Sequence, residues 1–223
     1  MNESANPSLD PANNDTLLGL LNVAIAKAMQ QMDNVLPATV VAYDRVKNRA
    51  QVQPQIKMID TNKNSITRAQ IASIPVFQYG GNGYLLSFPL KSGSFGWIIA
   101  CDRDISEFLQ NYSESSPSTY RKKSFSDSFF LPDVMTGYTI ASEDLENAVL
   151  QNIDGTVKIS LSPDKIKVSA KNVEVDCEQL SINSSSNISI NCSGNIILTT
   201  PQFYVSGNIS ASGTITPDSP PPP

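Results

Sequence analysis

Histidine is absent from the 223-residue sequence. Because histidine is the commonest general base near neutral pH and the commonest protein ligand for metals, most catalytic and metal-binding templates lose their first candidate. Two groups of acidic residues could still supply the carboxyl pair of a glycosidase: Asp102, Asp104 and Glu107, and Glu143, Asp144 and Glu146. Neighbours in sequence do not make such a pair, which needs a cleft and one raised pKa. We therefore expect no enzyme, no metal site and no cofactor.

Cysteine and charge are scarce as well. Cys101, Cys177 and Cys192 form no CxxC pair, so neither a disulfide framework nor a zinc site is indicated, and we expect three small buried side chains. Charged residues make up 17% of the chain and the formal net charge is −5. This balance argues against nucleic acid as a partner, since neutralising phosphates requires clustered Lys and Arg.

The N-terminal stretch 1–14 contains no basic residue and no apolar run, so no secretory signal is expected and disorder is predicted. A helix is predicted over 16–35, capped near Thr16 and ended by Pro37. Its apolar stripe is too short to span a bilayer. The stripe consists of Leu17, Leu20, Leu21, Ala24, Ala28 and Met32. An ordinary core helix and an apolar docking helix for a partner protein both remain open.

Short strand-like segments follow between the helix and about residue 136. The run "AQVQPQIKM" alternates apolar and polar residues, which predicts a strand, and Pro54 within it suggests a sheet edge or a bulge. "ATVVAY" precedes this run, beyond the turn-like "DRVKNR". Three further runs follow, "ASIPVFQ", "GYLLSFPL" and "FGWIIAC", separated by the turn-like "YGGNG" and "KSGS". A short helix is predicted in "DRDISEFLQNY", with Asp102 or Asp104 as its cap. Five short strands favour a small barrel or sandwich.

From about residue 152 the apolar residues recur in pairs or triplets at alternate positions, separated by corners rich in Ser, Asn, Asp or Gly. The pairs begin six to nine residues apart. Internal repetition of this length predicts a β-helix or a related solenoid, whereas a disordered tail would lack the regular alternation. The predicted core positions are Val157, Ile159, Ile166, Val168, Val173, Val175, Leu180, Ile182, Ile188, Ile190, Ile196, Leu198, Phe203, Val205, Ile209 and Ile215.

Each repeat supplies only one short strand, so one chain forms one wall of a prism and cannot shield its own apolar side. Its strand edges would also be open to pairing with other chains. Three copies wound about a common axis solve both problems, because every strand then pairs with its neighbours and the apolar side chains meet on the axis. The repeat therefore predicts a homotrimer.

Several stretches resemble the central spike proteins of contractile phage tails, over about residues 35–135. They are "LPATVVAYDRVKNRAQVQPQIK", "IPVFQYGGNGYLLSFPLKSGSFGWIIACDRDISEFL" and "RKKSFSDSFFLPDV". The landmarks are Tyr43-Asp44, Phe88-Pro89-Leu90, Asp102-Arg103-Asp104 and Ser126-Asp127. The resemblance implies an OB-fold domain followed by a trimeric β-helical needle. It implies a structural component of the virion's tail baseplate, made in the host cytoplasm, that plugs the tail tube and transiently pierces the host outer membrane. The spike of type VI secretion machines is similar in plan.

The expected fold is therefore mainly β: an N-terminal helix, an OB-fold barrel and an intertwined trimeric β-helix. The expected segments are a disordered tail with a hub-docking helix (1–36), the OB-fold domain (37–136), a linker (137–151), the needle (152–216) and a proline-rich apex (217–223). Through the helix, the expected partners are the baseplate hub and tail tube proteins.

The apex departs from metal-tipped relatives, which hold iron through His-x-His. This chain ends instead in a run containing Pro217 and Pro220, and proline cannot donate to a strand ladder, so pairing should stop near Thr216. Either the apex is blunt and metal-free, or a separate tip protein sits there.

Two other functions remain open on the sequence. A trimeric receptor-binding fibre or adhesin would also be rich in β-structure, although fibres usually end in an aromatic-bearing head and this chain tapers into Ser, Gly and Pro after Tyr204. An OB-type carbohydrate-binding module with an unstructured tail is the other alternative.

Overall fold

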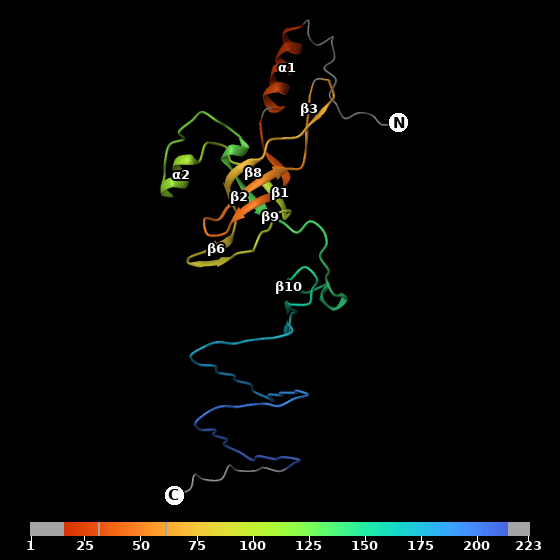
Figure 1. Ribbon diagram of the computed structural model, residues 1–223, viewed down its shortest axis with the longest axis vertical. Coiled ribbons are helices and arrows are strands. Elements are labelled where there is room, and N and C mark those ends of the chain that lie inside the picture. The colour runs from red at the N-terminus through yellow and green to blue at the C-terminus, as the bar shows by residue number, and fades with distance from the viewer. Residues whose placement is uncertain (1–15, 31, 61, 214–223) are drawn as a thin grey trace. The chain divides into compact units, whose positions relative to one another are not determined.

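The structure is a computed structural model that describes residues 16–30, 32–60 and 62–213 (Figure 1). The chain consists of two units, one ending at Asn172 and the other starting at Val173. Predictions for the tail 1–14, for Ile215 and for the apex residues Pro217 and Pro220 lie outside the described residues.

The predicted N-terminal helix is confirmed as α1 (Leu17–Gln30). The Thr16 hydroxyl accepts a hydrogen bond from the Gly19 amide at 3.0 Å, which satisfies one of the free N–H groups of the first turn. The prediction that Pro37 ends the helix is wrong. Pro37 lies inside the first strand, opposite Trp97, because a proline φ is compatible with extended backbone.

Five strands form an antiparallel sheet in the order β5-β2-β1-β8-β9, which we call the half-barrel. They are β1 (Val35–Asp44), β2 (Arg49–Pro54), β5 (Ile71–Pro75), β8 (Phe95–Ala100) and β9 (Ser128–Pro132). A parallel bridge joins Val76, just beyond β5, to Phe130 of β9, and the Phe77 amide donates to the Phe130 carbonyl at 2.8 Å. The two outer strands of the half-barrel are therefore linked to each other.

The half-barrel encloses the hydrophobic core. Along β2, Ala50, Val52 and Pro54 are buried while the residues between them are only partly covered, as the predicted alternation requires. Gly96 of β8 leaves room for the Phe130 ring of β9, since a Cβ there would lie 2.4 Å from that ring. The buried core residues are Ala38, Val40, Ala50, Val52, Ile74, Val76, Ile98, Phe125 and Phe130.

Pro54 does not lie on an edge strand, contrary to one of the two predictions for it. β2 runs between β1 and β5, and Pro54 is its last residue, beyond the final β2–β5 pair Val52–Ile71. No ladder donor is lost there. The register irregularities lie between Val40 and Ala42 and between Ala50 and Val52.

Three excursions leave the half-barrel. Two are hairpins, formed by β3 (Met58–Ile59) with β4 (Ser65–Ile66), and by β6 (Tyr79–Gly81) with β7 (Tyr84–Leu86). The third joins β8 to β9 and carries α2 (Ser106–Asn111), which confirms the predicted short helix. The prediction that Asp102 or Asp104 caps this helix is wrong, because its N-cap is Ile105, which makes no side-chain capping hydrogen bond. The Asp104 carboxylate lies one residue earlier and accepts from the Ser106 amide at 2.9 Å. The short 3₁₀ turn η2 (Phe125–Asp127) leads into β9.

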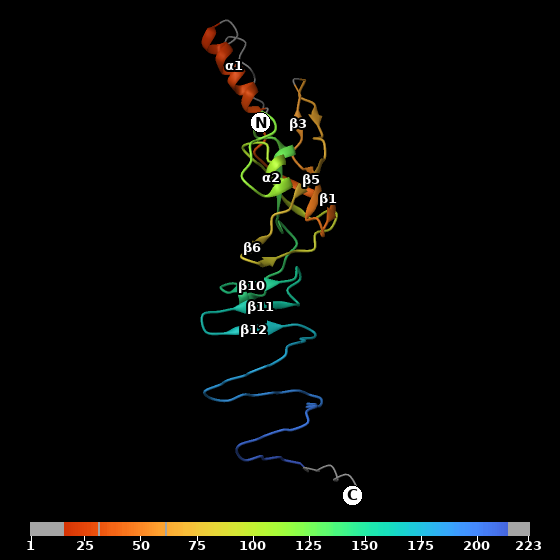
Figure 2. The same ribbon diagram turned by 90° about the vertical axis from the view of Figure 1, so that its left-hand side faces the viewer.

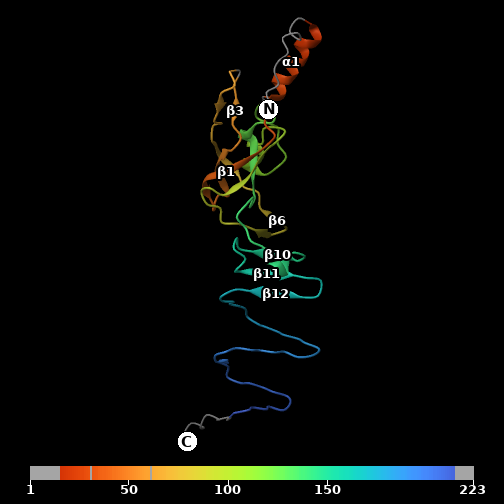
Figure 3. The same cartoon turned by 90° about the vertical axis from the view of Figure 1, so that its right-hand side faces the viewer.

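A second, three-stranded antiparallel sheet follows the half-barrel, after the short 3₁₀ turn η3 (Ser142–Asp144). It consists of β10 (Ala148–Gln151), β11 (Lys158–Leu161) and β12 (Ile166–Ser169), which lie side by side in Figures 2 and 3. Its first strand comes from the stretch expected to be a linker. We call it the second sheet.

The second unit has neither helix nor strand among its described residues, 173–213. Its chain runs in extended segments that bend at polar corners (Figure 2). Bends occur at Ser185–Ser186, Ser193–Gly194, Ser206–Gly207 and Ser212–Gly213. These corners fall between the predicted apolar pairs, whereas the β-helix itself is not formed in the single chain.

Candidate association surface

The second sheet has one polar face and one apolar face. Because neighbouring strands are in register, two apolar rows run across them: Leu150, Ile159 and Val168, and Ala148, Leu161 and Ile166. The opposite face carries the rows Val149, Ser160 and Lys167, and Gln151, Lys158 and Ser169. Leu150 was not among the predicted core positions, although the alternation of "AVLQ" could have indicated it.

The polar face is covered by the chain's own Glu143, Asp144 and Asn147. Lys158 Nζ donates to Asp144 Oδ2 and, at 3.0 Å, to Glu143 Oε1. Ser160 Oγ donates to Asp144 Oδ1 at 2.5 Å, and Asn147 Nδ2 donates to the same oxygen at 3.1 Å. We call this network the clasp.

Hydrogen bonds from Lys158, Ser160 and Asn147 hold the pKa of Asp144 well below its usual range. The same contact with Asp144, followed by that with Glu143, raises the pKa of Lys158. Each partner therefore favours the charged form of the other, and the clasp persists as an ion pair at neutral pH.

In the second sheet the polar face is buried and the apolar face is exposed. This is the reverse of the usual antiparallel sheet, in which the apolar face packs on the core and the polar face is solvated. Lys158 and Ser160 are 7% and 3% exposed, whereas Leu150 and Ile166 are 51% and 72% exposed. The chain thus supplies cover for the polar side chains and leaves the apolar rows open to association.

The clasp predicts an acid-sensitive contribution to stability. We expect Asp144→Asn to lower the thermal midpoint by similar amounts at pH 7 and pH 5, and by a smaller amount at pH 3. The reason is that the folded pKa of Asp144 is depressed, so its contribution is complete above the unfolded value, about 3.9, and is lost as the pH falls through the folded value.

Thermal unfolding followed by circular dichroism at pH 7, 5 and 3 measures this difference. Asp164→Asn is the matched control, because Asp164 lies exposed in the turn between β11 and β12 and, among the described residues, accepts a hydrogen bond only from Ser162. Equal midpoints for Asp144→Asn and the unchanged protein at pH 7 would contradict a stabilising clasp.

The predicted needle positions that the structure describes are all exposed in the single chain. Exposure across them runs from 40% at Ile159 to 72% at Ile166. They are Val157, Ile159, Ile166, Val168, Val173, Val175, Leu180, Ile182, Ile188, Ile190, Ile196, Leu198, Phe203, Val205 and Ile209. In the single chain, none of these side chains is buried in a hydrophobic core.

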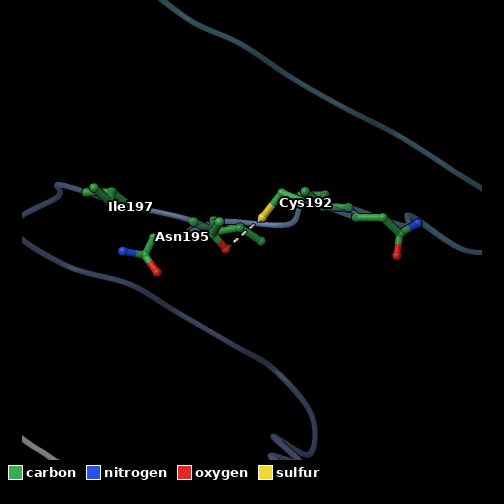
Figure 4. Close-up of a pocket in the computed structure, with 7 residues that line it drawn as sticks. Cys192, Asn195 and Ile197 are labelled. Atoms are coloured by element: carbon green, nitrogen blue, oxygen red, sulfur yellow. Dashed lines mark hydrogen bonds between the residues drawn. The ribbon is translucent and has the colours of Figure 1, made fainter.

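The expectation of three buried cysteines is wrong for the single chain. Cys101 is half-buried, and burial followed by the charge of Asp127 raises the pKa of its thiol. Cys177 and Cys192 are exposed, because no second layer among the described residues covers them. Figure 4 shows Cys192 at a bend, with its Sγ donating to the Gly194 carbonyl at 3.3 Å. The hollow beside Cys192 is a shallow surface depression and not an enclosed pocket, since every residue that lines it is exposed.

The predicted docking stripe lies on α1, except Met32, which follows the helix. Its residues Leu17, Leu20, Leu21, Ala24 and Ala28 are exposed, and Leu17 is 77% exposed. Leu18, Ile25 and Met29, also exposed, widen the apolar surface. A 14-residue helix is marginal on its own in water, and the apolar surface of α1 is not packed in the single chain. Within the described part of the chain, no helix combines the length and apolar character needed to cross a membrane.

The acidic groups weighed as a glycosidase pair engage in structural contacts. Arg121 Nε lies 2.9 Å from Asp127 Oδ2, and Arg121 Nη2 lies 3.4 Å from Asp104 Oδ2. Hydrogen bonds from Thr119 and Ser106 lower the pKa of Asp104. A general acid needs the opposite shift. Asp104 and Asp127, which are far apart in sequence, thus contact the same Arg121 guanidinium, which links the α2 excursion to η2.

In residues 16–30, 32–60 and 62–213, no group of three or more potential metal ligands is arranged to hold a metal ion.

Residues 36–133 match the family model of the phage protein Gp138 N-terminal domain. The matched range begins at the second residue of β1 and contains the other four strands of the half-barrel and the three excursions between them. This likeness supports a phage structural protein of the baseplate type. No curated protein matches the chain.

Proposed function

We propose that this chain is the central spike of a contractile phage tail. In this proposal the half-barrel is an OB-type base and the chain from β10 onward is one third of a needle. The likeness of residues 36–133 to a phage protein domain supports this assignment, because it points to a virion component.

The strand order supports the OB-type base. An OB fold is a five-stranded, partly open Greek-key barrel. In the half-barrel, β1 pairs with both β2 and β8, and a parallel bridge links β9 to the residue that follows β5. Thus β8 lies beside β1 at one side of the β5-β2-β1 group, and β9 is linked to the β5 end at the other side, as in a partly closed barrel.

The main support for the proposed needle is the exposed apolar face of the second sheet, together with the exposed apolar side chains that follow from Val173 onward. Exposing so many β-branched and aliphatic side chains costs about 25 cal/mol per Å² of apolar surface. In a homotrimer the apolar faces of three copies would meet on the axis, while each clasp would keep the polar face outside.

The proposed role is mechanical and not enzymatic. A needle must be stiff, narrow and resistant to unfolding under load. Strands that pair with two other chains meet this need, because pulling one chain out must break its ladders with both neighbours. The base would sit on the tail tube and close it, α1 would dock to the hub, and the needle would pierce the host outer membrane, with or without a separate tip protein.

Light scattering of the purified full-length protein tests the proposal. We expect a mass three times the 24.1 kDa of one chain, persisting on dilution, and a rod extending from a wider base in negative-stain electron microscopy. A folded, stable single chain in dilute buffer would overturn the proposed spike, because the needle would then need no partner copies.

A further inference from the structure

The β6–β7 hairpin is a preorganised projection from the half-barrel. Asn82 and Gly83 have φ of +49° and +87°, the left-handed pair that matches a tight two-residue hairpin turn. At the base, Gln78 Nε2 donates to Ser87 Oγ at 3.1 Å. The Phe77 ring there packs edge-on against Tyr79, with centroids 5.1 Å apart. The hairpin therefore keeps its shape without a partner.

One face of this hairpin is apolar and aromatic. The register pairs Tyr79 with Leu86 and Gly81 with Tyr84, so these side chains share a face, while Leu85 lies on the other. Tyr79 is 62% exposed, Tyr84 82% and Leu86 42%. We call Tyr79, Tyr84 and Leu86 the hairpin face.

A groove of about 710 Å³ opens beside the hairpin's attachment to the half-barrel. Its exposed apolar members are Phe88, Phe95, Val134 and Ile153. Asp133 also lines it and accepts a hydrogen bond from Trp97 Nε1 at 2.9 Å through Oδ2. The groove is thus mostly apolar with a carboxylate, a pattern that suits a tyrosine, whose ring seeks apolar cover and whose hydroxyl needs an acceptor.

The hairpin face does not fill the groove of its own chain. No residue of β6 or β7 lines the groove, and only Ser87 separates Leu86 from Phe88, the first residue that does. The bond between Gln78 and Ser87 holds the hairpin base at this point. Among the described residues, the hairpin face is therefore left without an apolar groove to enter in its own chain.

We propose that the hairpin face of one copy docks into the groove of the next copy, so that the bases of the trimer form a closed ring. This inference rests on the proposed function, because it presupposes three copies. A contact between two unlike patches of the same chain closes into a ring under threefold symmetry. The groove also reaches Ile153 in the β10–β11 turn, so the ring contact would continue into the trimer interface of the second sheet.

Disulfide trapping between differently tagged copies tests the contact. In a background with Cys101→Ser, Cys177→Ser and Cys192→Ser, one copy carries Tyr84→Cys and the other Val134→Cys. After co-expression and mild oxidation we expect a disulfide-linked dimer carrying both tags, which a link within one chain cannot produce. Leu85→Cys with Val134→Cys is the matched control, since Leu85 lies on the opposite hairpin face, and we expect no such dimer.

Light scattering of the same samples separates the two proposals. A trimer with no link from Tyr84, or with an equal link from Leu85, would overturn the ring contact and leave the spike intact. A single-chain mass would overturn both. If the Tyr84 variant fails to fold, Tyr79→Cys with Thr136→Cys provides a second pair on the same two surfaces, judged by the same outcomes.

Discussion

Replacing Ile190 with aspartate is expected to convert the proposed trimer into separate chains. Ile190 is 70% exposed in the single chain and belongs to the predicted axial rows. In a trimer, Ile190→Asp would place three carboxylates around one axis, and each buried ion costs several kcal/mol after relaxation. Their sum is comparable to the 5–15 kcal/mol that stabilises a whole domain, before mutual repulsion is counted.

Light scattering of Ile190→Asp against the unchanged protein measures this effect. Ser189→Asp is the matched control, since successive side chains of an extended segment point to opposite sides, so its charge would face solvent. We expect the control to remain trimeric. If Ile190→Asp also remains a trimer with the same resistance to dilution, the apolar rows do not meet on the axis.

Removing α1 is expected to leave a folded trimer that is absent from assembled baseplates. The structure sets where to cut. Asp33 belongs to the half-barrel, because its carboxylate bonds to Arg68 at 3.1 Å and accepts from the Phe125 amide at 3.1 Å. Deleting residues 1–29 therefore spares these contacts while removing the exposed apolar surface of α1.

Incorporation can be measured by immunoblotting purified particles that assemble with the truncated chain as their only copy. The pair Leu20→Asp and Leu21→Asp should reproduce the loss with full-length protein, whereas Asn22→Asp, which changes an already polar position of α1, should not. Normal incorporation of the truncated trimer would show that α1 does not dock the spike. A truncated chain that no longer forms trimers would assign α1 to the trimer itself.

Local patterns were sufficient to predict several elements. Thr16 marks the start of α1, the alternation of apolar residues predicts β2, and the serine-rich corners after residue 173 fall where the backbone bends. These features depend on a few neighbouring residues, whose side-chain periodicity and capping chemistry can be read along the chain. The mainly β class follows from the same local information.

Contacts between distant residues could not be predicted in this way. Nothing near Pro37 in sequence indicates that it lies opposite Trp97, and the landmarks at Asp104 and Asp127 do not reveal that Arg121 joins them. The hairpin face and its groove are likewise defined by register and by the approach of separate loops. Such placements depend on which surfaces pack together, and that is a property of the whole fold.

The sequence by itself determined that the chain after residue 152 is extended with one apolar side. Its apolar and polar residues alternate, and successive side chains of a strand point to opposite faces. Only the tertiary structure decided which side of the second sheet the chain covers. Periodicity divides side chains into two faces but does not say which is inside. The clasp makes that choice, because Asp144 can pair only with Lys158 and Ser160 on the polar face, and so the apolar rows are left open.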